Sequence, residues 1–413
     1  MRNRCYDINK NGLTPVTASF SAPAIPETFS LSRIGYLSVI AIVIAVISIA
    51  ASSGIAWVIA VFSTAINRAT DGGYILLPVV GALLLTALLR YASPFFNALG
   101  LTLAITTGAP LGAESPAMWW NSALGVWIGQ RLRCNEGEIY TLYVAGICAT
   151  LTFLFGAPVA AVFIALELLL PEWTLAGILP VATAVATAFV GYYIVWGPAS
   201  LYNIPEGTAV GLTDMPIYLS IGLLIGLMGA LAIKLSSIME KWFGKLPIKN
   251  RWYLLLVPLM VGLAGNRFPQ INSAGAAYVD DLLHAQVTLY LLFTLGIIKF
   301  LVWLCFSSAY KTGTGITPLL ITGGAMSLLV GVTIQLLFPH VIINASMIVL
   351  AGMVAMLAGT SRALLAAICL AIEITHGVSA WMPLCTAGIT AYGISLLLIK
   401  RQQLHRKAVI TIK

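Results

Sequence analysis

Long apolar stretches recur along the whole chain, and few polar side chains interrupt them. The stretch over residues 34–62, IGYLSVIAIVIAVISIAASSGIAWVIAVF, contains no charged residue, and later stretches such as YLSIGLLIGLMGALAI and TAYGISLLLI are similar. About 20 apolar residues cross the hydrocarbon layer of a membrane as one helix. The pattern therefore predicts an all-α polytopic membrane protein.

Other apolar stretches are too short for a full crossing, and Gly or Pro interrupts them. TLYVAGICATLTFLFGAPVAAVFIALELLLPEW divides into two pieces at the Gly-Ala-Pro sequence of residues 156–158. Proline lacks the N–H that a helix interior needs. Backbone groups freed in this way must be buried in protein or line a wet cavity. We therefore expect short, tilted and partly broken helices beside the longer ones.

A sequence repeat relates the two halves of the chain. APVAAVFIALE, which ends at Glu167, aligns without gaps with ALLAAICLAIE, which ends at Glu373. Interrupted segments at matching places in two halves indicate a binding site near the membrane midplane. The expected organisation is a cytoplasmic tail over residues 1–32, a transmembrane domain over residues 33–400 and a cytoplasmic tail over residues 401–413. The domain would contain two pseudo-symmetric halves, roughly residues 33–200 and 210–400.

Composition supports the membrane interpretation and excludes several other classes. Of 413 residues, 60% are hydrophobic and 9% are charged, whereas about a quarter are charged in soluble proteins. The net charge of +8 comes from basic flanks, including the C-terminal KRQQLHRKAVITIK. Basic residues near membrane ends favour the cytoplasmic side, so we expect both termini there, in a multi-pass protein of the cell (inner) membrane. The sequence has no soluble basic domain that would bind nucleic acid.

Candidate chemistry is sparse. The six cysteines have no paired spacing and the four histidines are scattered, so no metal site is expected. The sequence also lacks a nucleophile–base pair, so it predicts no catalytic residue, no enzymatic activity and no cofactor.

Two short motifs, GAESP at residues 112–116 and GITP at residues 315–318, stand out from the apolar background. In each, small residues lead into a helix whose proline lies near the start, where a missing N–H does no harm. The first N–H groups of a helix are unpaired and carry partial positive charge. Two such ends converging inside a membrane would bind a small anion.

Glu114, in the first motif, could occupy the place of that anion when ionised and leave it when protonated. A charge at this depth costs at least about 2.5 kcal/mol on insertion scales. This cost favours a functional role over simple helix capping.

Together these segments resemble the CLC family of voltage-gated chloride channels and chloride/proton antiporters. GAESP resembles the family's Gly-Arg/Lys-Glu-Gly-Pro motif, and GAPVAAVFIALELL its Pro-containing segment that ends in Glu. TGTGITPLLITGGAMSLLVG resembles the Gly-x-Phe-x-Pro helix, and AGMVAMLAGTSRALLAAICLAIEIT keeps the family's Ala-Gly-Met start and Glu-x-Thr end. The resemblance covers roughly residues 35–400. It implies inverted repeats in a lipid bilayer, and a homodimer whose subunits each have a pathway.

Carried over to this chain, the resemblance makes Glu114 the gating glutamate. It places anion contacts at Gly112 and Ala113 and at the backbone amides of Gly315 and Ile316. Ala113 stands where the family has a basic residue, and Ile316 where Phe is usual. Structural roles are expected for the prolines and for the charged residues that follow the motifs, namely Pro116, Pro158, Pro318, Glu167, Arg362 and Glu373.

The chain departs from the family pattern at three places. The family's anion-contacting serine has no clear counterpart; Ser93 is the nearest candidate and is otherwise a helix cap. The pore tyrosine is also missing, with Leu404 nearest by count, beside a basic flank that includes His405. The antiporters carry a second glutamate directly after the one matched by Glu167, and here that residue is Leu168.

Because leucine cannot relay a proton, the sequence favours a gated channel for chloride or a similar monovalent anion. A chloride/proton antiporter is the alternative, with Glu172 as a nearby acid that we expect to be solvated. A non-conducting scaffold or a membrane enzyme is a third interpretation. The choice among chloride, fluoride and nitrate stays open.

Overall fold

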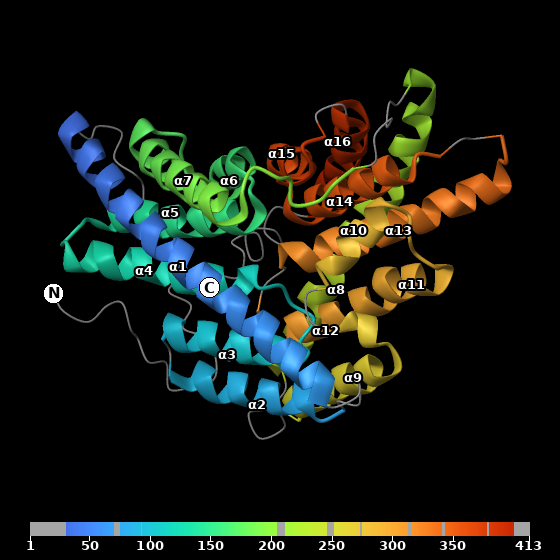
Figure 1. Ribbon diagram of the computed structural model, residues 1–413, viewed down its shortest axis with the longest axis horizontal. Coiled ribbons are helices and arrows are strands. Elements are labelled where there is room, and N and C mark those ends of the chain that lie inside the picture. The colour runs from blue at the N-terminus through green and yellow to red at the C-terminus, as the bar shows by residue number, and fades with distance from the viewer. Residues whose placement is uncertain are drawn as a thin grey trace.

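The computed structural model describes residues 30–69, 75–91, 93–204, 211–245, 252–272, 275–312, 315–340, 343–377 and 380–399. These residues form helices and connecting turns, and no β-strand occurs among them (Figure 1). The all-α fold expected from the apolar pattern is confirmed. Most of the predicted tails, with Leu404 and His405, lies outside the described residues.

The first half of the chain contains long helices separated by short ones, with one 3₁₀ turn and one π-helical turn: α1 (Leu31–Ala69), α2 (Leu77–Leu88), η1 (Leu89–Tyr91), α3 (Pro94–Thr106), α4 (Glu114–Arg131), α5 (Glu136–Phe155), α6 (Pro158–Ile164), η2 (Ala165–Leu169) and α7 (Leu175–Trp196). The second half has the same character: η3 (Leu212–Asp214), α8 (Met215–Lys245), α9 (Tyr253–Arg267), η5 (Pro269–Ile271), α10 (Ala277–Leu283), α11 (Leu289–Phe293), η6 (Thr294–Ile298), α12 (Lys299–Tyr310), α13 (Ile316–Leu337), α14 (Ala345–Ser361), α15 (Leu364–Thr375) and α16 (Trp381–Leu398).

Helices of two lengths make up the membrane domain. Within the described residues, 7 are long and apolar enough to cross a membrane: 31–66, 136–155, 175–196, 215–245, 289–310, 316–337 and 381–398. Shorter apolar helices lie between them, including α3, α14 and α15. The protein is therefore a multi-pass membrane protein with full spans and partial spans, as the sequence predicted.

The predicted break between α5 and α6 occurs where the sequence placed it. Gly156 ends α5 in the left-handed conformation, with φ 64°, and Pro158 is at the start of α6. A Cβ at Gly156 would lie 2.6 Å from the ring of Tyr192. Glycine is needed here both for its backbone conformation and because α7 packs against the turn.

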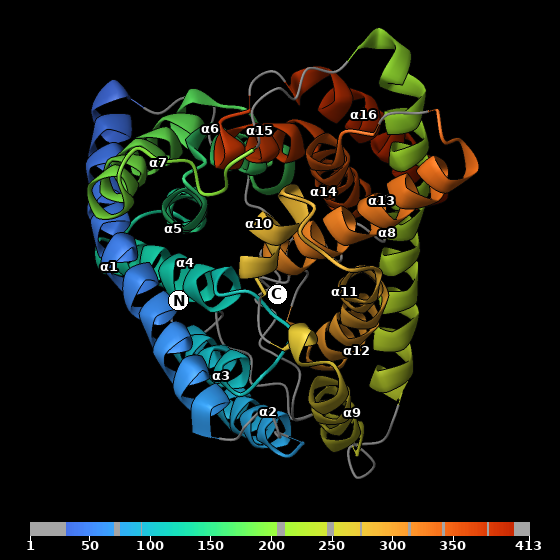
Figure 2. The ribbon, with the colours of Figure 1, turned by 45° about the vertical axis from the view of Figure 1, so that its right-hand side comes forward.

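The two halves meet where α6 and α15 lie side by side (Figures 1 and 2). The carboxylate of Glu167, at the end of the α6 segment, accepts hydrogen bonds from the N–H groups of Leu365 and Ala366 at 3.1 and 3.0 Å. Glu373, at the end of α15, accepts two N–H groups at the start of α6, at 2.9 and 2.8 Å. Each glutamate therefore satisfies the unpaired donors of the other helix, as expected for inverted repeats.

Close packing holds α4 against α5 and α1. Cβ atoms at Gly125 and Gly146 would lie 2.3 Å from backbone oxygens of the facing helix, so only glycine allows this approach. The buried Asn121 amide donates to Ser52 Oγ and Thr150 Oγ1 at 2.9 and 2.7 Å, which joins α4 to both neighbours. These contacts fix the direction of α4 and with it the position of Glu114.

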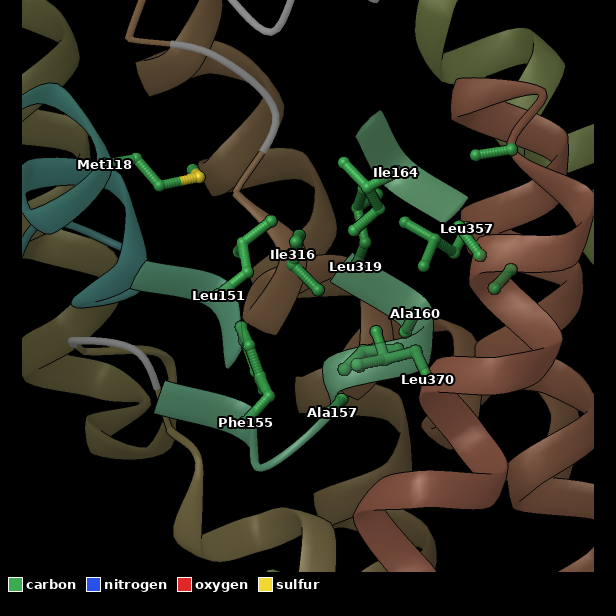
Figure 3. Packing of buried hydrophobic residues seen from close by; sticks show 14 of the residues in the cluster. Met118, Leu151, Phe155, Ala157, Ala160, Ile164, Ile316, Leu319, Leu357 and Leu370 are labelled. Atoms are coloured by element: carbon green, nitrogen blue, oxygen red, sulfur yellow. The ribbon is translucent and has the colours of Figure 1, made fainter. Parts of the chain in front are cut away.

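The apolar core fills the space between the halves. Figure 3 shows buried side chains from α4, α5, α6, α13, α14 and α15 gathered around the start of α13, where Ile316 lies. The first residues of α13 are thus held by both halves of the chain.

Candidate functional site

The structure brings the starts of α4 and α13 together at one buried carboxylate. Glu114 is the first residue of α4 and is 2% exposed. Its Oε1 accepts the backbone N–H of Thr317 at 2.8 Å, and its Oε2 accepts the Thr317 hydroxyl at 3.0 Å. The GAESP and GITP motifs therefore form one site, although about half of the chain separates them in sequence.

Glycines leave room for this carboxylate on both sides. A Cβ at Gly112 would lie 1.9 Å from Glu114 Oε2, and a Cβ at Gly315 would lie 3.3 Å from Oε1. Half-buried Ala113 and buried Ile316 complete the two turns. The Glu114 side chain thus folds back over the start of its own helix and reaches the start of the other.

The two helix starts have the same construction. Pro116 is the third residue of α4 and Pro318 is the third residue of α13. At this position proline removes an N–H that would have no partner inside the helix. The remaining first-turn N–H groups point outward and give each end its partial positive charge.

Partial charges, without a paired cation, stabilise the carboxylate. In the described part of the chain the ion pairs are Arg33–Glu138 and His284–Asp280, and neither involves Glu114. This matches the replacement of a basic residue by Ala113. Among the described residues, the carboxylate is therefore held by hydrogen bonds and by the partial charges of the helix starts.

The remaining predicted residues form no hydrogen bond with Glu114 in the described part of the chain. Ser93 precedes α3, and the 13 residues of that helix put it about 20 Å from the helix end that leads to Glu114. No hydrogen bond among the described residues joins Ser93 to the carboxylate, so its anion contact stays a prediction. Pro158, Glu167 and Glu373 belong to the contact between α6 and α15.

Arg362 closes the end of another helix. Its guanidinium donates to the Ser395 carbonyl at 2.8 Å, to the Ser395 hydroxyl at 3.3 Å and to the Ile399 carbonyl. Ser395 lies in the last turn of α16 and Ile399 directly follows the helix, so the guanidinium closes this helix end.

Residue 168, where the family's antiporters carry their second glutamate, is the apolar Leu168. Leu168 is half-buried in the π-helical turn η2, directly after Glu167, which is bonded to α15. Glu172 is exposed, as predicted. The Tyr140 hydroxyl lies close by and donates to the Leu169 carbonyl at 2.7 Å.

Three residues with notable surroundings were not found from the sequence. Thr317 carries both donors to Glu114, and the only signal was a hydroxyl residue directly before the proline of GITP. Lys299 is fully buried and donates to the Ile271 carbonyl at 3.2 Å; a lysine inside an apolar stretch could have marked it. The Tyr202 hydroxyl donates to the Ala276 carbonyl at 3.5 Å, and burial, with a smaller effect of the negative charges of Glu114 and Asp280, raises the pKa of Tyr202.

Comparisons with known proteins give separate evidence for the family and the fold. A family model described as voltage gated chloride channel matches residues 88–396. A protein of Vibrio cholerae serotype O1 named H(+)/Cl(-) exchange transporter ClcA is 28% identical over 324 residues, which cover 76% of this chain and 68% of that protein. A protein of Ralstonia nicotianae named putative chloride channel protein ClcB-like is 27% identical over 298 residues, which cover 70% and 68%.

Solved structures share the fold. A structure described as a slow cyanobacterial Cl-/H+ antiporter has a TM-score of 0.75 and 21% identity, with 92% of this chain and 99% of that chain covered. A CLC-type fluoride/proton antiporter has a TM-score of 0.74 and 18% identity, with 90% and 98% covered. At these identities the likeness is evidence for the fold.

Proposed function

The chain belongs to the voltage-gated chloride channel family, and from this membership we propose that it is a chloride/proton antiporter in which Glu114 is the gate. Anion transport across the membrane is the activity common to the family. The relative from Vibrio cholerae is named an exchange transporter, and both solved structures described above are antiporters. Antiport is therefore better supported than the channel that the sequence alone favoured.

The position of the Glu114 carboxylate carries the proposal. When ionised, it fills the space between two helix starts and accepts both donors of Thr317. Protonation removes the negative charge that these helix ends stabilise, so the side chain leaves and an anion takes its place. Because the departing side chain carries a proton and the arriving group is an anion, one site handles both ions alternately.

The anion contacts belong to the same proposal. Gly112, Ala113, Gly315 and Ile316 lie at the two helix starts beside the carboxylate, and their backbone N–H groups would contact a small anion that takes its place. Binding through dipoles replaces hydration and stays weak enough for release. No cofactor takes part in this mechanism, and we propose a homodimer in the lipid bilayer with one such site in each subunit.

A gated anion channel is the second candidate, and Leu168 is the observation that favours it. Leucine cannot pass a proton from the cytoplasm toward Glu114. Under antiport, protons would reach Glu114 by a path that does not use the side chain at residue 168. Proton coupling is therefore the property that separates the two candidates.

The test is a flux measurement in liposomes loaded with chloride. We would record chloride efflux and external pH together for the wild type, for Glu114→Gln and for Glu172→Gln, a control at an exposed acid. Antiport predicts that protons enter as chloride leaves, that a proton gradient drives chloride uphill, and that only Glu114→Gln abolishes proton movement. Chloride efflux without proton movement would identify a channel. A folded protein that moves neither chloride nor fluoride would contradict both candidates and leave a non-conducting scaffold.

A further inference from the structure

Thr317 binds the Glu114 carboxylate with two donors. Its N–H reaches one carboxylate oxygen at 2.8 Å and its hydroxyl reaches the other at 3.0 Å. The side chain is 7% exposed, so water does not compete freely for this hydroxyl. A helix start by itself offers only N–H groups, and the hydroxyl is an addition made by this residue.

The Thr317 hydroxyl does not have an ordinary helical role. A capping side chain lies just before the helix and bonds to N–H groups of the same helix, whereas Thr317 is the second residue of α13 and bonds to a side chain of α4. Deeper in a helix, Thr usually bonds to a carbonyl one turn back. Thr322 does so, with its hydroxyl 2.9 Å from the Pro318 carbonyl. The hydroxyl of Thr317 is directed at the place of the gate instead.

Ser115 contributes a second buried hydroxyl at the same place. It is 4% exposed, and its Oγ lies 3.5 Å from the position that a Cβ on Gly315 would occupy. Among the described residues no hydrogen bond to this oxygen is found. Buried polar groups nearly always have a partner, so this hydroxyl is available to a group that enters the site.

We infer that Thr317 is the specificity-determining residue of the anion site, and that its hydroxyl and N–H, with the Ser115 hydroxyl, bind the transported anion after Glu114 leaves. This inference rests on the proposed function. The ionised carboxylate marks the anion position, because the Thr317 N–H and hydroxyl need an acceptor both while Glu114 is in place and after it withdraws. The two hydroxyls also supply what the missing pore serine would have supplied, while Ser93 lies at the far end of α3.

Hydroxyl donors affect selectivity through the charge density of the anion. Short O–H contacts attract small anions such as chloride and fluoride more strongly than large ones such as iodide, because the interaction energy falls with the distance between charges. A site with these hydroxyls therefore prefers small anions, and their removal reduces that preference.

The test measures anion binding to purified protein by isothermal titration calorimetry in a Glu114→Gln background, where the carboxylate charge no longer competes. Thr317→Val removes the hydroxyl and nearly keeps the shape, Thr317→Ser keeps the hydroxyl, and Thr322→Val is a control on the same helix. We expect Thr317→Val to weaken chloride binding by about tenfold or more, because hydrogen bonds to charged groups are the stronger ones. Thr317→Ser and Thr322→Val should stay within about threefold of the parent, and only Thr317→Val should raise iodide binding relative to chloride.

The outcomes separate this inference from the proposed function. Unchanged chloride affinity and unchanged iodide-to-chloride ratio in Thr317→Val would overturn the inference, even where Glu114→Gln uncouples flux in liposomes. A parent that binds no chloride, together with a wild type that moves none, would overturn the proposed function and the inference with it. If Thr317→Val does not stay monodisperse, Thr317→Ala takes its place, and unchanged chloride affinity there would again contradict the assignment.

Discussion

Replacement of Gly112 by alanine should displace the gate without changing any titratable group. The new Cβ would lie 1.9 Å from Glu114 Oε2 and 2.3 Å from Oε1. Gly112 does not have a left-handed backbone, so alanine fits its conformation. The obstructing atoms are the far end of a flexible side chain, and the carboxylate can move away more easily than the backbone can.

The magnitude follows from the two hydrogen bonds that this movement breaks. Each hydrogen bond to a charged group is worth about 1.5–3 kcal/mol, so the bonds to Thr317 together favour the closed position by about 3–6 kcal/mol at most. Even half of that range is a shift of about tenfold or more in the closed-to-open ratio. Gly112→Ala should therefore speed chloride efflux and, like Glu114→Gln, reduce the proton movement for each chloride.

The assay is the same liposome experiment, with chloride and pH recorded together. Gly54→Ala, in α1, is the matched control, because a Cβ there meets nothing within 4 Å. A Gly112→Ala protein that keeps wild-type flux and wild-type proton coupling would refute the reasoning. It would mean that the carboxylate does not rest between Gly112 and Thr317 during transport.

Three further changes test other parts of the structure. Glu373→Ala leaves two N–H groups of α6 without an acceptor and should lower the free energy of unfolding by about 2–4 kcal/mol. Thermal unfolding in detergent measures this loss against Glu172→Ala, a control at an exposed site. Equal stability of the two variants would contradict the capping role of Glu373. Burial raises the pKa of Tyr202 above its usual 10.0, so the hydroxyl stays protonated at every pH below that value. The neutral hydroxyl's contribution to the free energy of unfolding is lost only as the pH rises through the folded-state pKa. Tyr202→Phe should therefore leave the pH profile of chloride efflux unchanged from about pH 4 to 8, whereas a shifted midpoint would implicate this hydroxyl in proton transfer. Leu168→Glu adds a carboxylate next to Glu167 and should raise proton flux under a proton gradient, and unchanged proton flux would show that the inner route passes elsewhere.

Much of the fold could be predicted because its signals are local. The length and apolar character of residues 34–62 were enough for a membrane helix, and the Gly-Ala-Pro sequence at 156–158 was enough for a break. The aligned glutamates Glu167 and Glu373 were expected to have structural roles, but the sequence did not say which N–H groups each would accept. The structure shows that each accepts N–H groups at the start of the other helix.

The details of the site could not be predicted in the same way. Which side chain of GITP faces Glu114 depends on how α4 and α13 approach each other through the packing of α5 and α14, and no local pattern records this approach. Thr317 was missed for that reason. Ser93 was chosen by counting along a connection that is shorter than the family pattern, and such counting gives a position in sequence without a position in space.

Three membrane-embedded glutamates accept N–H groups at helix starts, yet only Glu114 is suited to move. Glu167 and Glu373 bond to helices packed against their own, so withdrawal of either would leave two helix-start N–H groups without their acceptor. Glu114 lies between Gly112 and Gly315, where no side chain takes up the space, and its donors include a hydroxyl that can turn toward another acceptor. Under the proposed function, a small anion takes the vacated position when Glu114 leaves, and the donors keep a partner. The difference between a structural carboxylate and a gate therefore depends on what can replace the carboxylate after it moves.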